Sequence, residues 1–109
     1  MKMNTLQWLM NWYESNCDGD WEHSHTNIII STLDNPGWRL QFNVMGTLYQ
    51  DMDFNDIQIE RTENNWIYCE KKDGVIDCAC GPQNLEEMIE ILKNWIEKQK
   101  NIHKTPEIS

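Results

Sequence analysis

The sequence predicts an α+β domain in which an N-terminal and a C-terminal helix pack on one face of an antiparallel meander of about five strands. Near both ends of the chain, apolar residues recur at three- and four-residue spacing, which is typical of helices that bury one side. Between them, β-branched or alternating segments are separated by turns rich in Gly, Pro, Asn and Asp. Two helices that both need apolar cover are most simply placed on the same side of the sheet.

The length of the chain bounds its organisation. Its 109 residues are the size of one domain, and the 39% apolar content with six Trp is enough to build one core. We predict a single domain over residues 1–101 and a frayed polar tail over residues 102–109.

The first helix is predicted over residues 5–17, with Asn4 or Thr5 as its cap. Trp8 and Trp12 are four residues apart and point to another side of this helix, where we expect them to pack under a loop or tail or to be partly exposed. The core face is predicted to comprise the residues that follow the helical repeat: Leu6, Leu9, Met10, Tyr13 and Cys17.

The first two strands are predicted over residues 26–33 and 38–44, joined by the turn Asn35-Pro36-Gly37. In this turn Pro36 fixes one φ angle, Gly37 permits a positive one, and Trp38 starts the next strand on its apolar face. Gly46 should break the second strand, and residues 47–49 are predicted to form a third, weaker one.

Residues 57–62 and 66–72 are predicted to form a hairpin, and Asp73-Gly74 is a strong turn signal leading to a last strand over residues 75–80. The turn Gly81-Pro82 follows. Asn84 then caps the second helix, with Glu87 in the capping-box position, and this helix should end near Lys100. Its buried stripe is predicted to be Leu85, Met88, Ile89, Leu92, Trp95 and Ile96.

Acidic residues are concentrated in the first half of the chain. The formal net charge is -9, residues 1–60 hold nine acids and two bases, and no base lies between Lys2 and Arg39. Such a surface repels phosphate and attracts basic proteins, so we expect neither nucleic acid nor an anionic membrane as a partner. Solubility alone would explain the same composition equally well.

The apolar runs are shorter than the roughly 20 residues that span a bilayer, and the first residues lead into a helix and not into a signal peptide. We therefore expect a cytoplasmic protein. Its four cysteines, Cys17, Cys69, Cys78 and Cys80, are then expected as reduced thiols, mostly buried as small hydrophobic side chains.

The densest cluster of chemical groups is the segment from Asp18 to His25, which holds three carboxylates, two imidazoles and an indole. Gly19 and Trp21 are expected to shape and anchor this loop. Asp18, Asp20, Glu22 and His23 are candidates for contact with a partner. On the sheet face opposite the helices we expect Arg39 and Gln41, together with Asn43.

The alternative is a small metal-binding or hydrolytic enzyme that uses Asp20, Glu22, His23 and the Cys78/Cys80 pair. His23-x-His25 and Cys78-x-Cys80 could together supply four zinc ligands, although structural zinc sites ordinarily use wider spacings on turns. No nucleophile elbow, phosphate-binding glycine loop or HExxH pattern is present, so enzyme signatures are missing. We therefore expect no catalytic residue, no metal and no cofactor.

Taken together, the motifs of the chain resemble the immunity protein 53 family of bacterial polymorphic toxin systems over roughly residues 6–96. The two longest motifs are far more specific than any short pattern. The resemblance is carried by the early helix with Trp and Tyr, by Cys17-Asp18-Gly19-Asp20-Trp21-Glu22-His23, by Thr32-Leu33-Asp34-Asn35-Pro36-Gly37-Trp38, by Trp66 and Cys69, and by Gly81-Pro82-x-Asn84-Leu85.

The resemblance implies a non-enzymatic cytoplasmic antitoxin that binds a cognate toxin domain and blocks it. Combined with the charge, it leads us to expect a basic nuclease-type toxin, met by an acidic surface; the sequence leaves the oligomeric state open. The residues that we expect at the interface are Asp18, Asp20, Glu22, His23, Asp34, Arg39 and Gln41. Those expected to hold the fold are Gly19, Trp21, Pro36, Gly37, Trp38, Gly81, Pro82 and Asn84.

Overall fold

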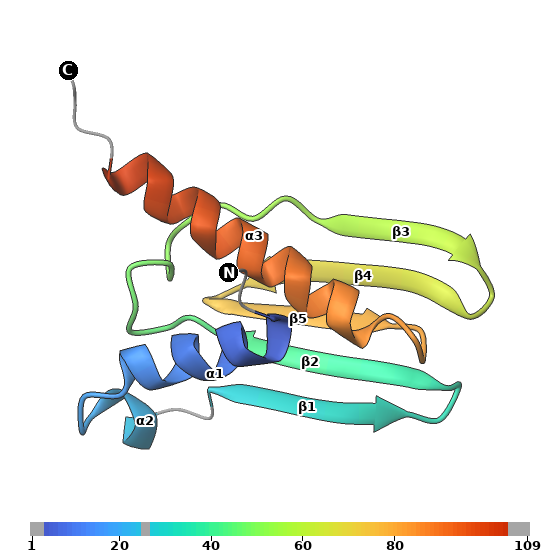
Figure 1. Cartoon of the computed structure of the whole chain (residues 1–109), viewed down its shortest axis with the longest axis horizontal. Helices are drawn as coiled ribbons and strands as arrows, with labels where there is room; N and C mark the ends of the chain where they lie inside the picture. Colours follow the sequence, from blue (N-terminus) through green and yellow to red (C-terminus); the bar gives the residue numbers. More distant parts are fainter. Residues whose placement is uncertain (1–3, 25–26, 105–109) are drawn as a thin grey trace.

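A computed structural model describes residues 4–24 and 27–104 and shows two layers, with two long helices lying across one face of a single sheet (Figure 1). Within these ranges the α+β class and the five antiparallel strands are confirmed. The elements are α1 (Thr5–Asn16), α2 (Trp21–Ser24), β1 (Ile28–Leu33), β2 (Gly37–Asn43), β3 (Ile57–Thr62), β4 (Asn65–Lys72), β5 (Val75–Cys80) and α3 (Leu85–Lys104).

The strand order is β1-β2-β5-β4-β3, so the last strand of the chain occupies the centre of the sheet. The β1–β2 hairpin forms one side and the pair β3–β4 forms the other, and β5 is paired with both β2 and β4. This order leaves β1 and β3 as the two edges.

Gly37 is required where β2 passes β5, because a Cβ atom there would collide with the carbonyl oxygen of Cys80. Gly37 does not use the positive φ that a glycine would permit in this turn. Among the described residues, the glycines with positive φ are Gly19, Gly46 and Gly74. The absence of a side chain at Gly37 serves the close approach of two backbones.

The core fills the space between the helices and the inner face of the sheet. The stripe predicted for α3 is confirmed: Met88, Leu92 and Ile96 are fully buried, and Leu85 and Trp95 pack at its border. The sheet contributes alternate residues from its central strands, among them Leu40, Phe42, Ile67, Ile76 and Cys78.

The predicted core face of α1 is wrong at Leu6, Met10 and Tyr13, whereas Leu9 is buried as predicted. Leu6 and Met10 are 61% and 49% exposed, whereas Trp8 and Trp12 are buried. The indoles take the core side of the helix because their large rings fill the space between α1 and the sheet. The ring centroids of Trp12 and Phe42 are 4.4 Å apart. Leu6, Met10 and Tyr13 are left on the solvent side of the helix.

Residues 47–49 form turns and no strand, so the prediction of a weak third strand there is wrong. The carbonyl of Val44 accepts hydrogen bonds from both the amide and the hydroxyl of Thr47, which closes a turn where a ladder would have to continue. Further along this connection, the indole nitrogen of Trp95 donates to the carbonyl of Asp53 at 2.8 Å, which ties the segment to α3.

The helix α3 runs to Lys104 and so passes Lys100, where it was predicted to end. Residues 105–109 of the predicted tail, and Thr26 at the predicted start of β1, lie outside the described residues. In the part of the chain that is described, none of the helices combines the length and apolar character that crossing a membrane requires.

Candidate functional site: an uncovered acidic sheet face and the loop beside it

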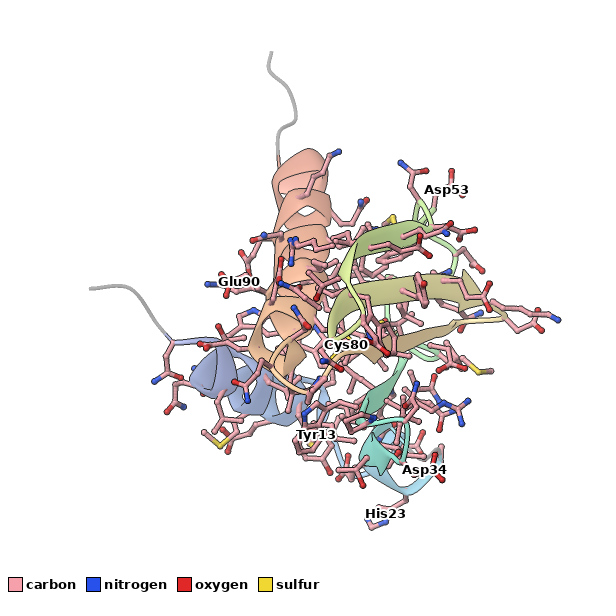
Figure 2. All side chains as sticks on the ribbon, turned by 90° about the vertical axis from the view of Figure 1, so that its right-hand side faces the viewer. Tyr13, His23, Asp34, Asp53, Cys80 and Glu90 are labelled. Atoms are coloured by element: carbon pink, nitrogen blue, oxygen red, sulfur yellow. The ribbon has the colours of Figure 1, made fainter. Side chains whose placement is uncertain are left out.

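None of the described helices covers one of the two faces of the sheet. In the end-on view of Figure 2, the helices lie on one side of the strands and side chains project freely from the other. The register places Arg39 and Gln41 on this outer face, as predicted, beside Ala79 and Asp77 of β5. Tyr68 and Glu70 of β4 continue the same two rows across the sheet.

Arg39 is held in an ion pair on this face. Its Nε and Nη2 atoms donate to the two carboxylate oxygens of Asp77 at 3.1 and 2.8 Å. The paired carboxylate raises the pKa of Arg39. Both side chains are more than a third exposed, so solvent screens the pair and it contributes little to stability. Its main effect is to neutralise the guanidinium locally.

Two shallow hollows open on the outer face. The larger, about 520 Å³, is bordered by Arg39, Asp77 and two further carboxylates, Asp56 and Glu70. The smaller, about 340 Å³, is bordered by Glu60, Glu63 and Trp66, and Tyr68 lines both. The two hollows thus contain five carboxylates and one guanidinium, which is already paired.

Aromatic side chains lie between these carboxylates. The ring centroids of Trp66 and Tyr68 are 5.2 Å apart, and Tyr68 is 40% exposed. The Tyr68 hydroxyl donates a hydrogen bond to Glu60, which lowers the pKa of Glu60 and raises that of Tyr68. Sequence reasoning missed this group, although the alternation of β4 gives the signal, since Trp66, Tyr68 and Glu70 must share one face.

The acidic loop, residues 18–24, includes the short helix α2 and is held together by hydrogen bonds within itself. One carboxylate oxygen of Asp18 accepts from the amides of Asp20 and Trp21 at 3.0 and 2.9 Å. The Glu22 carboxylate reaches back to the amides of Asp18 and Gly19 at 3.0 and 2.9 Å. These reciprocal bonds satisfy amides at the start of the short helix, as capping groups do.

Two of the candidate partner-contacting carboxylates therefore also shape the loop. Hydrogen bonds from backbone amides, above all that of Trp21, lower the pKa of Asp18, and the pKa of Glu22 is lowered chiefly by its own backbone amide. The Asp20 carboxylate, by contrast, accepts no hydrogen bond from the described residues, and His23 is exposed on α2. Asp20 and His23 stay predicted partner contacts, with no capping role seen for either side chain in the described part of the loop.

Gly19 and Trp21 lie where a structural role would put them. Gly19 has a φ of 90°, a conformation that other residues rarely adopt. Trp21 is buried against Trp12 and Tyr13, with centroid distances of 6.0 and 5.9 Å. The loop is thereby fixed to α1.

The predicted interface residues do not form one cluster. Asp34 lies in the turn after β1, and the acidic loop lies at the other end of that strand (Figure 1). Arg39 and Gln41 face outward between these two ends, in β2. His25 lies outside the described residues.

The residues of the alternative zinc site are also separated in the structure. Cys78 and Cys80 are buried in the core under the helices, whereas His23 is exposed on α2, and Figure 2 shows Cys80 and His23 well apart. Burial raises the pKa of Cys80 to about 11, and a hydrogen bond with Cys69 together with burial raises that of Cys78. Among the residues described, no three His, Cys, Asp or Glu side chains are grouped so that they could hold a metal ion.

The remaining motif residues join strands to the start of α3. The Trp38 indole donates to the carbonyl of Pro82 at 3.1 Å, and a Cβ atom at Gly81 would collide with the carbonyl oxygen of Asn64. The bond between Asn35 and Pro36 is cis.

Asn84 precedes α3 as predicted, and its carbonyl accepts from the Met88 amide at 2.9 Å. Its side chain departs from the predicted cap, because Nδ2 donates to Asn65 and Glu87 while Oδ1 is buried without a partner among the described residues. Glu87 accepts two hydrogen bonds from Arg61, at 2.9 and 2.6 Å. These contacts fasten the β3–β4 hairpin to α3.

Comparison with known proteins matches the chain to a family model. A family model described as immunity protein 53 matches residues 6–97, which include α1, the acidic loop, the whole sheet and most of α3. No curated protein and no solved structure matches the chain. Since the matched span covers most of the 109 residues, the chain belongs to the immunity protein 53 family.

Proposed function

We propose that this chain neutralises a cognate bacterial toxin domain by binding it through the acidic outer face of the sheet and covering its active surface. Membership of the family gives the chain an immunity role in general terms. The particular mechanism, occlusion by an inhibitor that does no chemistry, is our proposal. We also propose that the chain acts in the cytoplasm of the producing cell.

The observation that carries the proposal is the group of five carboxylates around Tyr68, on a face that neither long helix covers. Carboxylates arranged in this way attract a basic surface and speed its encounter. A nuclease-type toxin holds its substrate with Lys and Arg, and these side chains are the natural partners of Asp56, Glu60 and Glu70.

The aromatic side chains complete the proposed interface. Hot spots of protein interfaces are enriched in Trp and Tyr, which bury a large area when water is excluded around them. Trp66 and Tyr68 are in contact and partly exposed in the middle of the acidic face, so they can serve as anchors. Asp20 and Asp34, at opposite ends of β1, extend the negative field beyond the hollows.

The test is to co-express the chain with toxin domains encoded beside its gene and to score both survival and complex formation. Replacing Asp56→Lys and Glu70→Lys together should reduce protection and slow association. The matched control is Glu14→Lys with Glu86→Lys, which changes the net charge equally on exposed positions of α1 and α3. If no toxin is bound by the unmodified chain, or if both double variants lose binding equally, the proposal fails.

A further inference from the structure

The two edges of the sheet differ in how well they are protected. Strand β3 carries Glu60 and Arg61, and its pairing with β4 shifts register between Glu60 and Thr62. Charges and irregularities of this kind discourage another chain from pairing with an edge. Strand β1, Ile28–Leu33, has no charge and no proline, and it pairs with β2 in unbroken register over all six residues.

The outward backbone groups of β1 can be assigned from one hydrogen bond. The Asn43 amide donates to the Asn27 carbonyl at 2.8 Å, so residues 27, 29, 31 and 33 direct their backbone groups toward β2. Ile28, Ile30 and Thr32 must direct theirs away from the sheet. No described segment lies on that side of β1, which is the end of the strand order.

The side chains of this edge are suited to a second strand. Ile29 and Ile30 are 39% and 40% exposed and lie on opposite faces of the sheet. Apolar side chains left half-covered at an edge gain cover when another strand is added beside them, while the backbone of that strand completes the ladder.

The charges around β1 indicate which kind of strand can pair with its free edge. The acidic loop with Asp20 and Glu22 lies before β1, and Asp34 follows it. On the neighbouring strand, Arg39 is opposite Ser31, but it is paired with Asp77. Two copies of β1 paired antiparallel would bring the acidic loop of each close to Asp34 of the other, so like charges oppose a dimer through this edge.

From these observations we infer that β1 is the docking edge for an extended segment of the toxin domain, which adds a sixth, antiparallel or parallel strand. The segment has apolar residues in its middle and basic residues at both ends. This inference rests on the proposed function, and it adds where and how the toxin is bound.

Amide hydrogen exchange of the intact chain, followed residue by residue with and without the co-expressed toxin domain, tests the inference directly. The amides of Ile28, Ile30 and Thr32 should exchange readily in the free chain and about tenfold or more slowly in the complex. The amides of Ile29 and Ser31 face β2 and should be protected in both states, which provides an internal control.

A pair of variants tests the same edge by affinity. Thr32→Pro removes an outward amide without removing a ladder bond to β2, and it should weaken binding about tenfold or more. Thr32→Ala removes the side chain but keeps the amide and should bind nearly as the unmodified chain does. If Thr32→Pro fails to fold, as circular dichroism would reveal, the exchange pattern of the unmodified chain decides.

Each result is decisive. A bound toxin that leaves the amides of Ile28, Ile30 and Thr32 unprotected overturns the inference but leaves the proposed function standing. A chain that protects these amides by itself at high concentration and sediments as a dimer overturns the choice of a toxin segment over a second copy. If the unmodified chain binds no toxin, the proposed function fails and the inference fails with it.

Discussion

The indole nitrogen of Trp21 donates a hydrogen bond to the carbonyl of Met45 at 2.9 Å and so fixes the acidic loop to the chain just beyond β2. The two residues are 24 positions apart in sequence, and the Trp21 side chain is 6% exposed. Through the Trp21 side chain, the acidic loop is anchored in the hydrophobic core.

Replacement of Trp21 by Ala should lower the free energy of unfolding by about 3 to 5 kcal/mol, because a large buried ring is lost. Trp21→Phe keeps part of the ring and loses the hydrogen bond, so it should be clearly less destabilising. Urea denaturation measures both variants. Equal losses would mean that the bond to Met45, and not the packing, holds the loop.

The acidic loop should make stability depend on pH. Asp18 and Glu22 both have pKa values lowered by backbone hydrogen bonds in the folded chain. Their contribution is therefore complete above the unfolded pKa values of about 3.9 and 4.3, and it is lost as the pH falls through the lower folded values. Urea denaturation from about pH 6 to pH 2 should show a shallower acid loss for Asp18→Asn with Glu22→Gln than for the unmodified chain. An unchanged slope would contradict this role.

The two sides of α1 should respond differently to truncation. Leu9 is 6% exposed and Leu6 is 61% exposed. Leu9→Ala should lower the free energy of unfolding by about 2 to 5 kcal/mol, whereas Leu6→Ala should change it by less than about 0.5 kcal/mol. Thermal or urea denaturation compares the same substitution on the two faces, and similar losses would return Leu6 to the core.

Two glycines should differ in the reason for their presence. At Gly37 an added Cβ meets the backbone of Cys80, so Gly37→Ala should lower the free energy of unfolding by about 2 kcal/mol or more. At Gly19 the added atom meets nothing within 4 Å, and only the positive φ is unfavourable, which should give a loss of about 1 to 2 kcal/mol. Denaturation curves of both variants test the order of the two losses.

The parts of the fold that the sequence predicted correctly are those with one dominant local pattern. The stripe of α3 and the strands around the Asp73-Gly74 turn are of this kind. In α1, two stripes with three- and four-residue spacing overlap, one through Leu6 and Met10 and the other through Trp8 and Trp12. Periodicity alone does not choose between them. The choice depends on Phe42, which lies thirty residues from Trp12 and is brought under it by the sheet.

The candidate site was predictable where it follows strand alternation and not where it depends on strand order. Arg39 and Gln41 were expected on the open face, and the structure places them there. Their neighbours Asp77 and Tyr68 come from β5 and β4, and nothing local in the sequence says that β5 lies between β2 and β4. Likewise, the use of Asp18 and Glu22 as capping groups depends on a short helix that hydrophobic periodicity cannot reveal in four residues.

The central position of β5 also has a consequence for synthesis of the protein. During translation the β1–β2 hairpin and the β3–β4 pair emerge first, but each lacks its neighbour until residues 75–80 have left the ribosome. The hydrophobic surfaces of α1 and β2 also stay partly uncovered until α3, the last of the described elements, has been synthesised. A nascent chain therefore cannot complete its sheet until β5 has been synthesised, and a prematurely terminated product that lacks β5 should be removed by proteases rather than accumulate as a partial inhibitor.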